Sequence, residues 1–136
     1  GYTGSGNGVN IIEYITISTT GDALDFGDLT DVYYGAACTS DTTRAVTGGG
    51  RKAGTQVNNI EYFTMATTGN SQDFGDLTLT RVYFSACSDA TKAVFGGGYN
   101  PAVNTLDYIT IQTTGNAIDF GDLSNTGRGT AAASGD

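Results

Sequence analysis

The pentapeptide Asp-Phe-Gly-Asp-Leu occurs three times in this chain of 136 residues. The copies begin at Asp25, Asp73 and Asp119, so successive copies are 48 and 46 residues apart. Three tyrosines follow the same two steps, namely Tyr14, Tyr62 and Tyr108. The tripeptide Thr-Thr-Gly recurs in the same register and begins at residues 19, 67 and 113. The chain is therefore a tandem array with a unit of about 47 residues, a period typical of propeller blades or of helical repeats.

The pattern within each unit favours β-strands over helices. Apolar residues do not recur at helical spacing, and the 21 glycines interrupt every segment at short intervals. One unit contains four short runs rich in β-branched and aromatic residues, separated by turn residues. In the order first to fourth, these strand types are represented by residues 81–87, 91–95, 60–65 and 72–77. The sequence thus predicts an all-β fold.

The third run of each unit is apolar at both odd and even positions. In the first unit, Ile12 and Tyr14 would share one face of a strand, and Ile15 and Ile17 the other. A strand with two apolar faces belongs in a sheet that is covered on both sides, as are the middle strands of stacked propeller blades. We therefore expect tandem four-stranded antiparallel blades of a β-propeller.

The repeat register predicts a single array over residues 1–136 that begins and ends within a blade. It contains eleven expected strands, about 2.75 blades, whereas propellers close with about four to eight. The chain opens at Gly1 rather than at a methionine, which indicates a processed product or an excerpt of a longer chain. We expect an incomplete ring whose two ends, at residues 128–134 and around Ile12 and Tyr14, require further blades or self-association to cover them.

The order of apolar, glycine, aromatic and basic residues resembles the kelch repeat. The residues that carry the resemblance are Phe95, Gly96, Gly97, Tyr108, Phe120 and Arg128. The repeated sequence pattern is also similar to that of repeat proteins of aquatic bacteriophage virions, associated with tails or appendages. The pattern reads Tyr-x-Thr-x-x-Thr-Thr-Gly, then Asn or Asp, then x-x-Asp-Phe-Gly-Asp-Leu. These resemblances imply a kelch-like β-propeller with a virion or extracellular location.

The repeated pentapeptide has two interpretations. In the structural one, phenylalanine fills the space between blades, glycine permits a bulge or close approach, leucine packs, and the aspartates cap turn amides. In the other, pairs such as Asp25 with Asp28 bind a hard cation, although calcium needs about six to eight oxygens. We predict the structural role and no metal. The motif residues are Asp25, Phe26, Gly27, Asp28, Leu29, Asp73, Phe74, Gly75, Asp76, Leu77, Asp119, Phe120, Gly121, Asp122 and Leu123.

Three acidic residues, Glu13, Glu61 and Asp107, occupy one repeat position among apolar neighbours. The structural interpretation pairs them with a basic residue of the same or the next blade. Two basic repeat positions are available, Arg44 with Lys92 and Arg81 with Arg128. The alternative is a pair of carboxylates for glycoside hydrolysis. Because catalytic residues are expected to break a repeat rather than obey it, we predict no enzyme activity and no cofactor.

The charge balance limits the partners. The net charge of -8 disfavours nucleic acid and anionic membranes, since both require a basic face. Histidine, the commonest metal ligand and general base, is absent from the sequence. The expected partners are other blades of the same protein or further copies, together with virion proteins and cell-surface glycan.

The positions that differ between units follow the glycine triplets and form the opening stretch. Loops on a rigid scaffold are where recognition residues concentrate. The candidate ligand-binding residues are Tyr2, Arg51, Lys52, Tyr99 and Asn100. The leading hypothesis is a non-enzymatic structural and binding module, a tail-fibre or appendage component of a bacteriophage virion involved in host attachment. The alternatives are a secreted or cell-surface carbohydrate-binding propeller and, third, a glycan-active enzyme.

Overall fold

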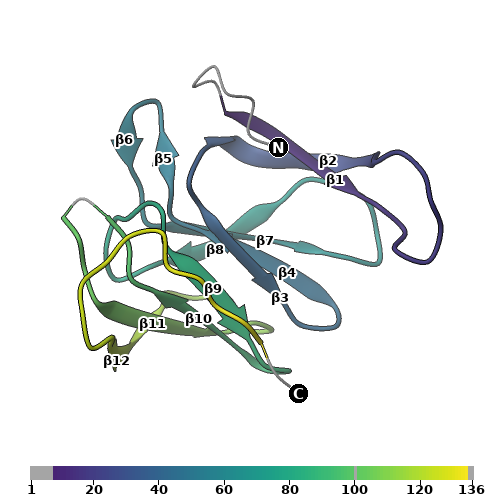
Figure 1. Ribbon diagram of the computed structural model, residues 1–136. Coiled ribbons are helices and arrows are strands. Elements are labelled where there is room, and N and C mark those ends of the chain that lie inside the picture. The colour runs from purple at the N-terminus through teal and green to yellow at the C-terminus, as the bar shows by residue number, and fades with distance from the viewer. Residues whose placement is uncertain (1–7, 100, 135–136) are drawn as a thin grey trace.

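The computed structural model describes residues 8–99 and 101–134, which form an all-β structure without a helix (Figure 1). The first sheet pairs β1 (Val9–Tyr14) with β2 (Leu24–Tyr33). The second sheet consists of β3 (Ala37–Ser40), β4 (Arg44–Gly48), β7 (Asn59–Thr64) and β8 (Gln72–Asp76). The third sheet consists of β9 (Ser85–Ser88), β10 (Lys92–Gly96), β11 (Thr105–Thr110) and β12 (Ile118–Asp122). A short separate hairpin joins β5 (Arg51–Lys52) to β6 (Thr55–Gln56).

The two four-stranded sheets share one topology. Each is an antiparallel meander in which neighbours along the chain pair in the order first, second, third and fourth strand. Their registers correspond, because Val46 faces Tyr62 in the second sheet and Val94 faces Tyr108 in the third. Both also carry a register shift at the same repeat position of the third strand. The predicted strand types and their order are confirmed, and the first sheet supplies only the third and fourth types.

The hydrophobic core lies between the second and third sheets. Ile60 of β7 and Phe95 of β10 are fully buried, and Phe74 of β8 packs in the same cluster. The cluster also contains Ala37, Val46, Leu77, Phe84, Ala93, Ile109 and Ile111. Burying a side chain the size of isoleucine or phenylalanine contributes about 1.5–3 kcal/mol. This cluster therefore holds the two four-stranded sheets against each other.

The expectation that third strands are covered on both faces is confirmed inside the molecule and fails at one end. In β7 the adjacent residues Ile60 and Glu61, which point to opposite faces, are both buried. In the first sheet, by contrast, Ile15 and Ile17 are exposed, whereas Tyr14, on the other side, contacts the ring of Phe26. Within the described residues no sheet covers the side of Ile15 and Ile17, so this end is bare. The uncovered residues were expected around Ile12 and Tyr14, on the other side, where Ile12 is half-buried.

The first-type strands begin later than predicted. A strand was expected from residue 81, but β9 starts at Ser85. Tyr83 adopts a φ of 58°, in the left-handed region that a regular strand cannot contain. Gly35 occupies the same repeat position before β3 with a φ of 69°. The residue before each of these positions, Tyr34 or Val82, forms an isolated bridge with the residue that follows a glycine triplet, Arg51 or Tyr99 respectively.

Two further differences are a predicted strand that is absent and a hairpin that was not predicted. The expected eleventh strand over residues 128–134 is absent, because no second-type strand in the described part of the chain lies beside it. This segment instead passes β9, where Ser134 Oγ accepts a hydrogen bond from the Ser88 amide at 3.0 Å. The β5–β6 hairpin was not predicted. Its two-residue turn places Ala53 and Gly54 at φ values of 46° and 86°, as in a type I′ turn. The described residues form no closed ring (Figure 1).

Candidate functional site

The repeated pentapeptide and the Thr-Thr-Gly turn meet where one sheet contacts the next. At the junction between the first and second sheets, called the first junction, the Gly69 amide donates to the Phe26 carbonyl at 2.8 Å. The Ser71 amide donates to the Asp28 carbonyl, also at 2.8 Å. The Asp28 amide in turn donates to Asn70 Oδ1 at 3.0 Å. The motif of one unit thus bonds the turn of the next unit, mostly through the main chain.

The same three bonds recur between the second and third sheets, at the second junction. The amides of Gly115 and Ala117 donate to the carbonyls of Phe74 and Asp76, both at 2.8 Å. The Asp76 amide donates to Asn116 Oδ1 at 3.1 Å. Because these partners sit at equivalent repeat positions, one pattern of contacts explains why two separate sequence motifs recur in strict register.

Glycine in the motif permits this close approach. Gly27 and Gly75 have φ values of 150° and 145°. A Cβ atom at Gly27 would lie 2.3 Å from the Gly69 carbonyl oxygen, and one at Gly75 would lie 2.4 Å from the Gly115 carbonyl oxygen. Such contacts are with main-chain atoms, so no side chain fits at either position. The predicted role of the glycine is confirmed.

The phenylalanines of the motif pack between sheets in two of the three copies. Phe26 is buried and contacts Phe63 of the second sheet with ring centroids 5.1 Å apart. Phe74 and Leu77 are buried in the main core. Phe120 is exposed, because no further sheet among the described residues covers β12. The predicted packing therefore depends on a following sheet.

The aspartate side chains of the motif were predicted to cap turn amides, and this is mostly wrong. Within the described residues, only Asp119 shows such a bond, from the Gly121 amide to its Oδ1 at 3.3 Å. In the other two copies it is the main chain of Asp28 and Asp76 that bonds the neighbouring turn. The described residues contain no group of three or more acidic, cysteine or histidine residues that could hold a metal ion.

The buried carboxylate at the second junction belongs to an ion pair. Asp107 is fully buried, and Arg81 Nη2 donates to its Oδ2 at 2.6 Å. Thr78, which directly follows the pentapeptide, donates to the same carboxylate from its amide at 3.1 Å and from its hydroxyl at 2.6 Å. Burial lowers the pKa of the Arg81 guanidinium, and the charge of Asp107 partly offsets this. The predicted pairing with a basic residue is confirmed for Asp107.

Among the described residues, the equivalent carboxylate at the first junction, Glu61, is hydrogen-bonded only by neutral groups. It is buried and accepts hydrogen bonds from the amide and hydroxyl of Thr30, from Ser71 Oγ and from Asn59 Nδ2. Tyr33 stands at the repeat position of Arg81, and its hydroxyl accepts from Asn59 Nδ2 at 2.9 Å. Burial, with a further contribution from Glu61, raises the pKa of the Tyr33 phenol. The third member of the set, Glu13, is exposed.

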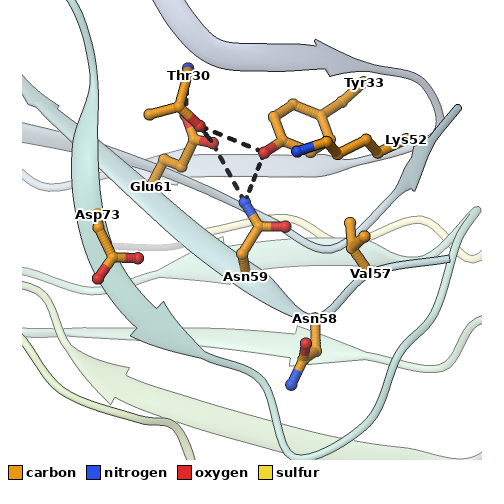
Figure 2. Close-up of a pocket in the computed structure, with 8 residues that line it drawn as sticks. All are labelled: Thr30, Tyr33, Lys52, Val57, Asn58, Asn59, Glu61 and Asp73. Carbon is orange, nitrogen blue, oxygen red and sulfur yellow. Dashed lines mark hydrogen bonds between the residues drawn. The ribbon is translucent and has the colours of Figure 1, made fainter.

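A pocket lies beside Glu61 at the first junction, where Tyr33 holds the repeat position of Arg81. It has a volume of about 310 Å³, and Figure 2 shows Glu61, Thr30, Asn59 and Tyr33 joined by hydrogen bonds on one side of it. Its lining residues are Thr30, Tyr33, Lys52, Val57, Asn58, Asn59, Glu61 and Asp73. The predicted equivalence of Arg81 with Arg128 is wrong by one residue. The second and third units are 46 residues apart, so the residue equivalent to Arg81 is Gly127.

The predicted ligand-binding residues lie on two equivalent loops rather than in one site. Lys52 lines the pocket and pairs with Asp31 at 2.6 Å on the surface. Arg51 stacks over the ring of Tyr34 and donates to its hydroxyl at 3.2 Å. Tyr99 is exposed, and the Arg128 guanidinium lies 4.7 Å from its ring centroid. Tyr2 and Asn100 fall outside the described residues.

A repeated turn between the first and second strands was missed at the sequence level. Asp41 Oδ1 accepts from the amides of Thr43 and Arg44, both at 2.7 Å, and Asp89 does the same for its own turn. Gln112, in the turn that follows β11, also donates to Asp41 Oδ2. Burial alone would raise the pKa of Asp41, but the bonds from Gln112 and the two amides outweigh it and hold the pKa at about 2. The available signal was the recurrence of Ser-Asp-x-Thr before Arg44 and Lys92.

The chain matches no protein-family model, and none of the curated proteins matches its sequence. In the described part of the chain there is no helix long and apolar enough to cross a membrane. The assignment of a role therefore depends on the geometry of the junctions, the pocket and the loops.

Proposed function

We propose that this chain is a non-enzymatic structural and binding module, built of kelch-like propeller blades. The observation that carries the proposal is the repeated junction, in which motif and turn are used for main-chain bonds between sheets. Residues that recur to hold sheets together leave recognition to the positions that vary between units. Those positions follow the glycine triplets, where the β5–β6 hairpin and Tyr99 present exposed side chains.

The buried carboxylates support a structural role. Asp107 is bonded by an arginine and by Thr78, and Glu61 is bonded by three neutral side chains and a main-chain amide. A general acid or nucleophile must reach its substrate. In this chain the donors of the fold already occupy the oxygens of both carboxylates.

The context that we propose is a bacteriophage virion, where the module is part of a tail fibre or appendage and takes part in host attachment. The similarity of the repeat sequence to virion repeat proteins supports this context, together with the exposed, variable loops. The test is binding of the fluorescently labelled chain to a panel of bacterial cells. We expect binding that falls at least several-fold in an Arg51→Ala/Lys52→Ala variant. A Leu79→Ala variant, altered at another exposed position, is the control. Absence of binding to every strain would contradict attachment by this chain.

The pocket beside Glu61 favours one second candidate, carbohydrate binding. Hydroxyl, amide and carboxylate groups line it together with the ring of Tyr33, a combination suited to sugar hydroxyls. Asp73 is exposed at its edge, whereas Asp25 holds the same repeat position in the first unit away from the pocket. If a glycan array detects a ligand, Asp73→Asn should weaken its binding and Asp25→Asn should not. Equal effects of the two variants would place the ligand elsewhere.

A further inference from the structure

The outer face of the third sheet carries one half of a junction. At both internal junctions the fourth strand of one sheet contacts the turn and third strand of the next. On β12 the same surface has nothing against it within the described residues. Phe120 is 57% exposed, whereas its equivalent Phe74 is 3% exposed. A Cβ atom at Gly121 would meet no atom within 4 Å, unlike one at Gly27 or Gly75.

The outer face of the first sheet carries the other half. Ile15 and Ile17 are 62% and 94% exposed, although their repeat equivalents Ile109 and Ile111 are 3% and 0% exposed. In the turn before the first pentapeptide, Ala23 is exposed, whereas its equivalents Ser71 and Ala117 are buried and half-buried. The equivalent turns, at Gly69 and Gly115, each receive the pentapeptide of the preceding unit.

The hydrogen-bonding groups on the two faces are complementary. By repeat equivalence, the carbonyls of Phe120 and Asp122 match the amides of Gly21 and Ala23, as Phe74 and Asp76 match Gly115 and Ala117. The Asp122 amide matches the carboxylate of Asp22, which replaces the asparagine of the other turns.

A side-chain pair extends the match. Thr30 and Thr78 each donate to the carboxylate of the next sheet, Glu61 and Asp107 respectively. Ser124 holds the equivalent position after the third pentapeptide, and Glu13 holds the equivalent carboxylate position in β1; both are exposed. An exposed hydroxyl donor at one end therefore corresponds to an exposed carboxylate acceptor at the other.

We propose that a second copy of this chain docks head to tail, with its first sheet on the outer face of the third sheet, and so forms a third junction. Such a contact is heterologous, so it generates rings or filaments rather than a closed two-fold dimer. Pairing of two identical β12 faces would set carbonyl against carbonyl, which the complementary arrangement avoids. The bonds named above come from third strands, fourth strands and their turns, so they do not require a second strand in the composite sheet.

The test is sedimentation of the wild-type chain and two face variants from low to high micromolar concentration. The N-face variant is Ile15→Lys/Ile17→Lys and the C-face variant is Phe120→Lys, all at exposed positions. Leu79→Lys, exposed but on neither face, is the control. Circular dichroism checks that each variant is folded, and Phe120→Ser replaces Phe120→Lys if the latter is not.

We expect the wild type and the Leu79→Lys control to increase in mass with concentration, beyond the 14.0 kDa of one chain. Each face variant alone should remain a single chain. An equimolar mixture of the two should form a complex of two chains and no more, because only one intact pair of faces remains. A wild type that stays monomeric overturns the proposal, as does a face variant that still associates alone or a mixture that does not combine. This outcome is independent of what the loops bind.

Discussion

The first and second junctions use the same main-chain bonds but treat the carboxylate that they enclose in different ways. At the second junction Asp107 is neutralised by Arg81, whose side chain is buried and also bonds the carbonyls of Phe95, Gly97 and Thr105. At the first junction Tyr33 takes the place of the arginine, and Glu61 depends on hydroxyl and amide donors beside an open pocket.

This difference shows which part of the repeat sets the geometry. Since both junctions keep the same three bonds between pentapeptide and turn, the register of the sheets does not depend on the ion pair. A buried ion pair often adds little net stability compared with other ways of filling the site, whereas removal of one partner is costly. The position of Arg81 and Tyr33 is thus free to vary, provided that the carboxylate keeps its donors.

The largest expected effect is at the ion pair. Arg81→Met leaves Asp107 buried without its cation, so we expect a loss of about 3–5 kcal/mol in the free energy of unfolding. Tyr33→Phe, at the same repeat position of the first junction, removes one neutral hydrogen-bonding group and should cost about 0.5–1.5 kcal/mol. Urea denaturation measures both. Similar losses for the two variants would show that the junctions are equivalent in energy as well as in geometry.

The second prediction concerns the phenylalanine of the motif. Phe74→Ala creates a cavity in the core and should cost about 3–5 kcal/mol. The same change at exposed Phe120 should cost less than about 0.5 kcal/mol in the single chain, since surface substitutions have small effects. Asp76→Asn, which retains the main-chain bonds, should cost about 1 kcal/mol or less. Large and equal losses for Phe74→Ala and Asp76→Asn that calcium reverses would instead indicate a metal site.

A smaller effect is expected at Glu61. Glu61→Gln replaces one acceptor oxygen with a donor group that faces Thr30 and Ser71, so a loss of about 1–2 kcal/mol follows from the weakened hydrogen bonds. Asp107→Asn should be more destabilising, because it leaves the guanidinium of Arg81 buried without its counter-charge. Thermal unfolding of the two variants side by side would contradict this interpretation if Glu61→Gln were the more damaging.

The smallest prediction concerns pH. The pKa of Asp41 is about 2 in the folded chain, below its ordinary value of 3.8, so its contribution to stability is fully present above about pH 4 and is lost as pH falls towards 2. Because this carboxylate is near the surface, we expect less than about 1 kcal/mol after solvent screening. Asp41→Asn should flatten the dependence of the melting temperature on pH in this window. Asp89→Asn should do so less, since Asp89 has no equivalent of the Gln112 bond among the described residues.

Much of the fold could be predicted because the apolar side chains that pack it recur at equivalent positions of the repeat. The buried Phe26, Phe74 and Leu77 recur in register, and so do the paired strands that carry them. The bonds between pentapeptide and turn could not be derived in the same way, since main-chain groups are identical at every residue. Only the constant spacing between the two motifs gave a signal for them. Tyr83 illustrates a further limit, because its left-handed φ is visible only through the glycines at the equivalent positions, Gly35 and Gly129.

The candidate site was less predictable. The pocket is lined by Tyr33, which holds the repeat position of Arg81. The sequence comparison matched Arg81 with Arg128 by residue type, one position from its true equivalent, and so did not identify Tyr33 as the residue at this position. Lys52, chosen as a candidate because its position varies between units, lines the pocket. Its role in binding a ligand stays a prediction.

The placement of motif and turn within one unit has a consequence for how such a gene changes length. Each unit carries an acceptor surface on its fourth strand and a donor surface on the preceding turn, both made largely by the main chain. Duplication or deletion of one whole unit of about 47 residues therefore preserves every remaining junction, wherever in the array the recombination occurs. A change in the number of residues between the turn and the pentapeptide of one unit would alter the spacing of the two surfaces. Recombination between equivalent units can therefore lengthen or shorten this protein with the main-chain bonds of its junctions retained, provided that Arg81 and Asp107 stay together.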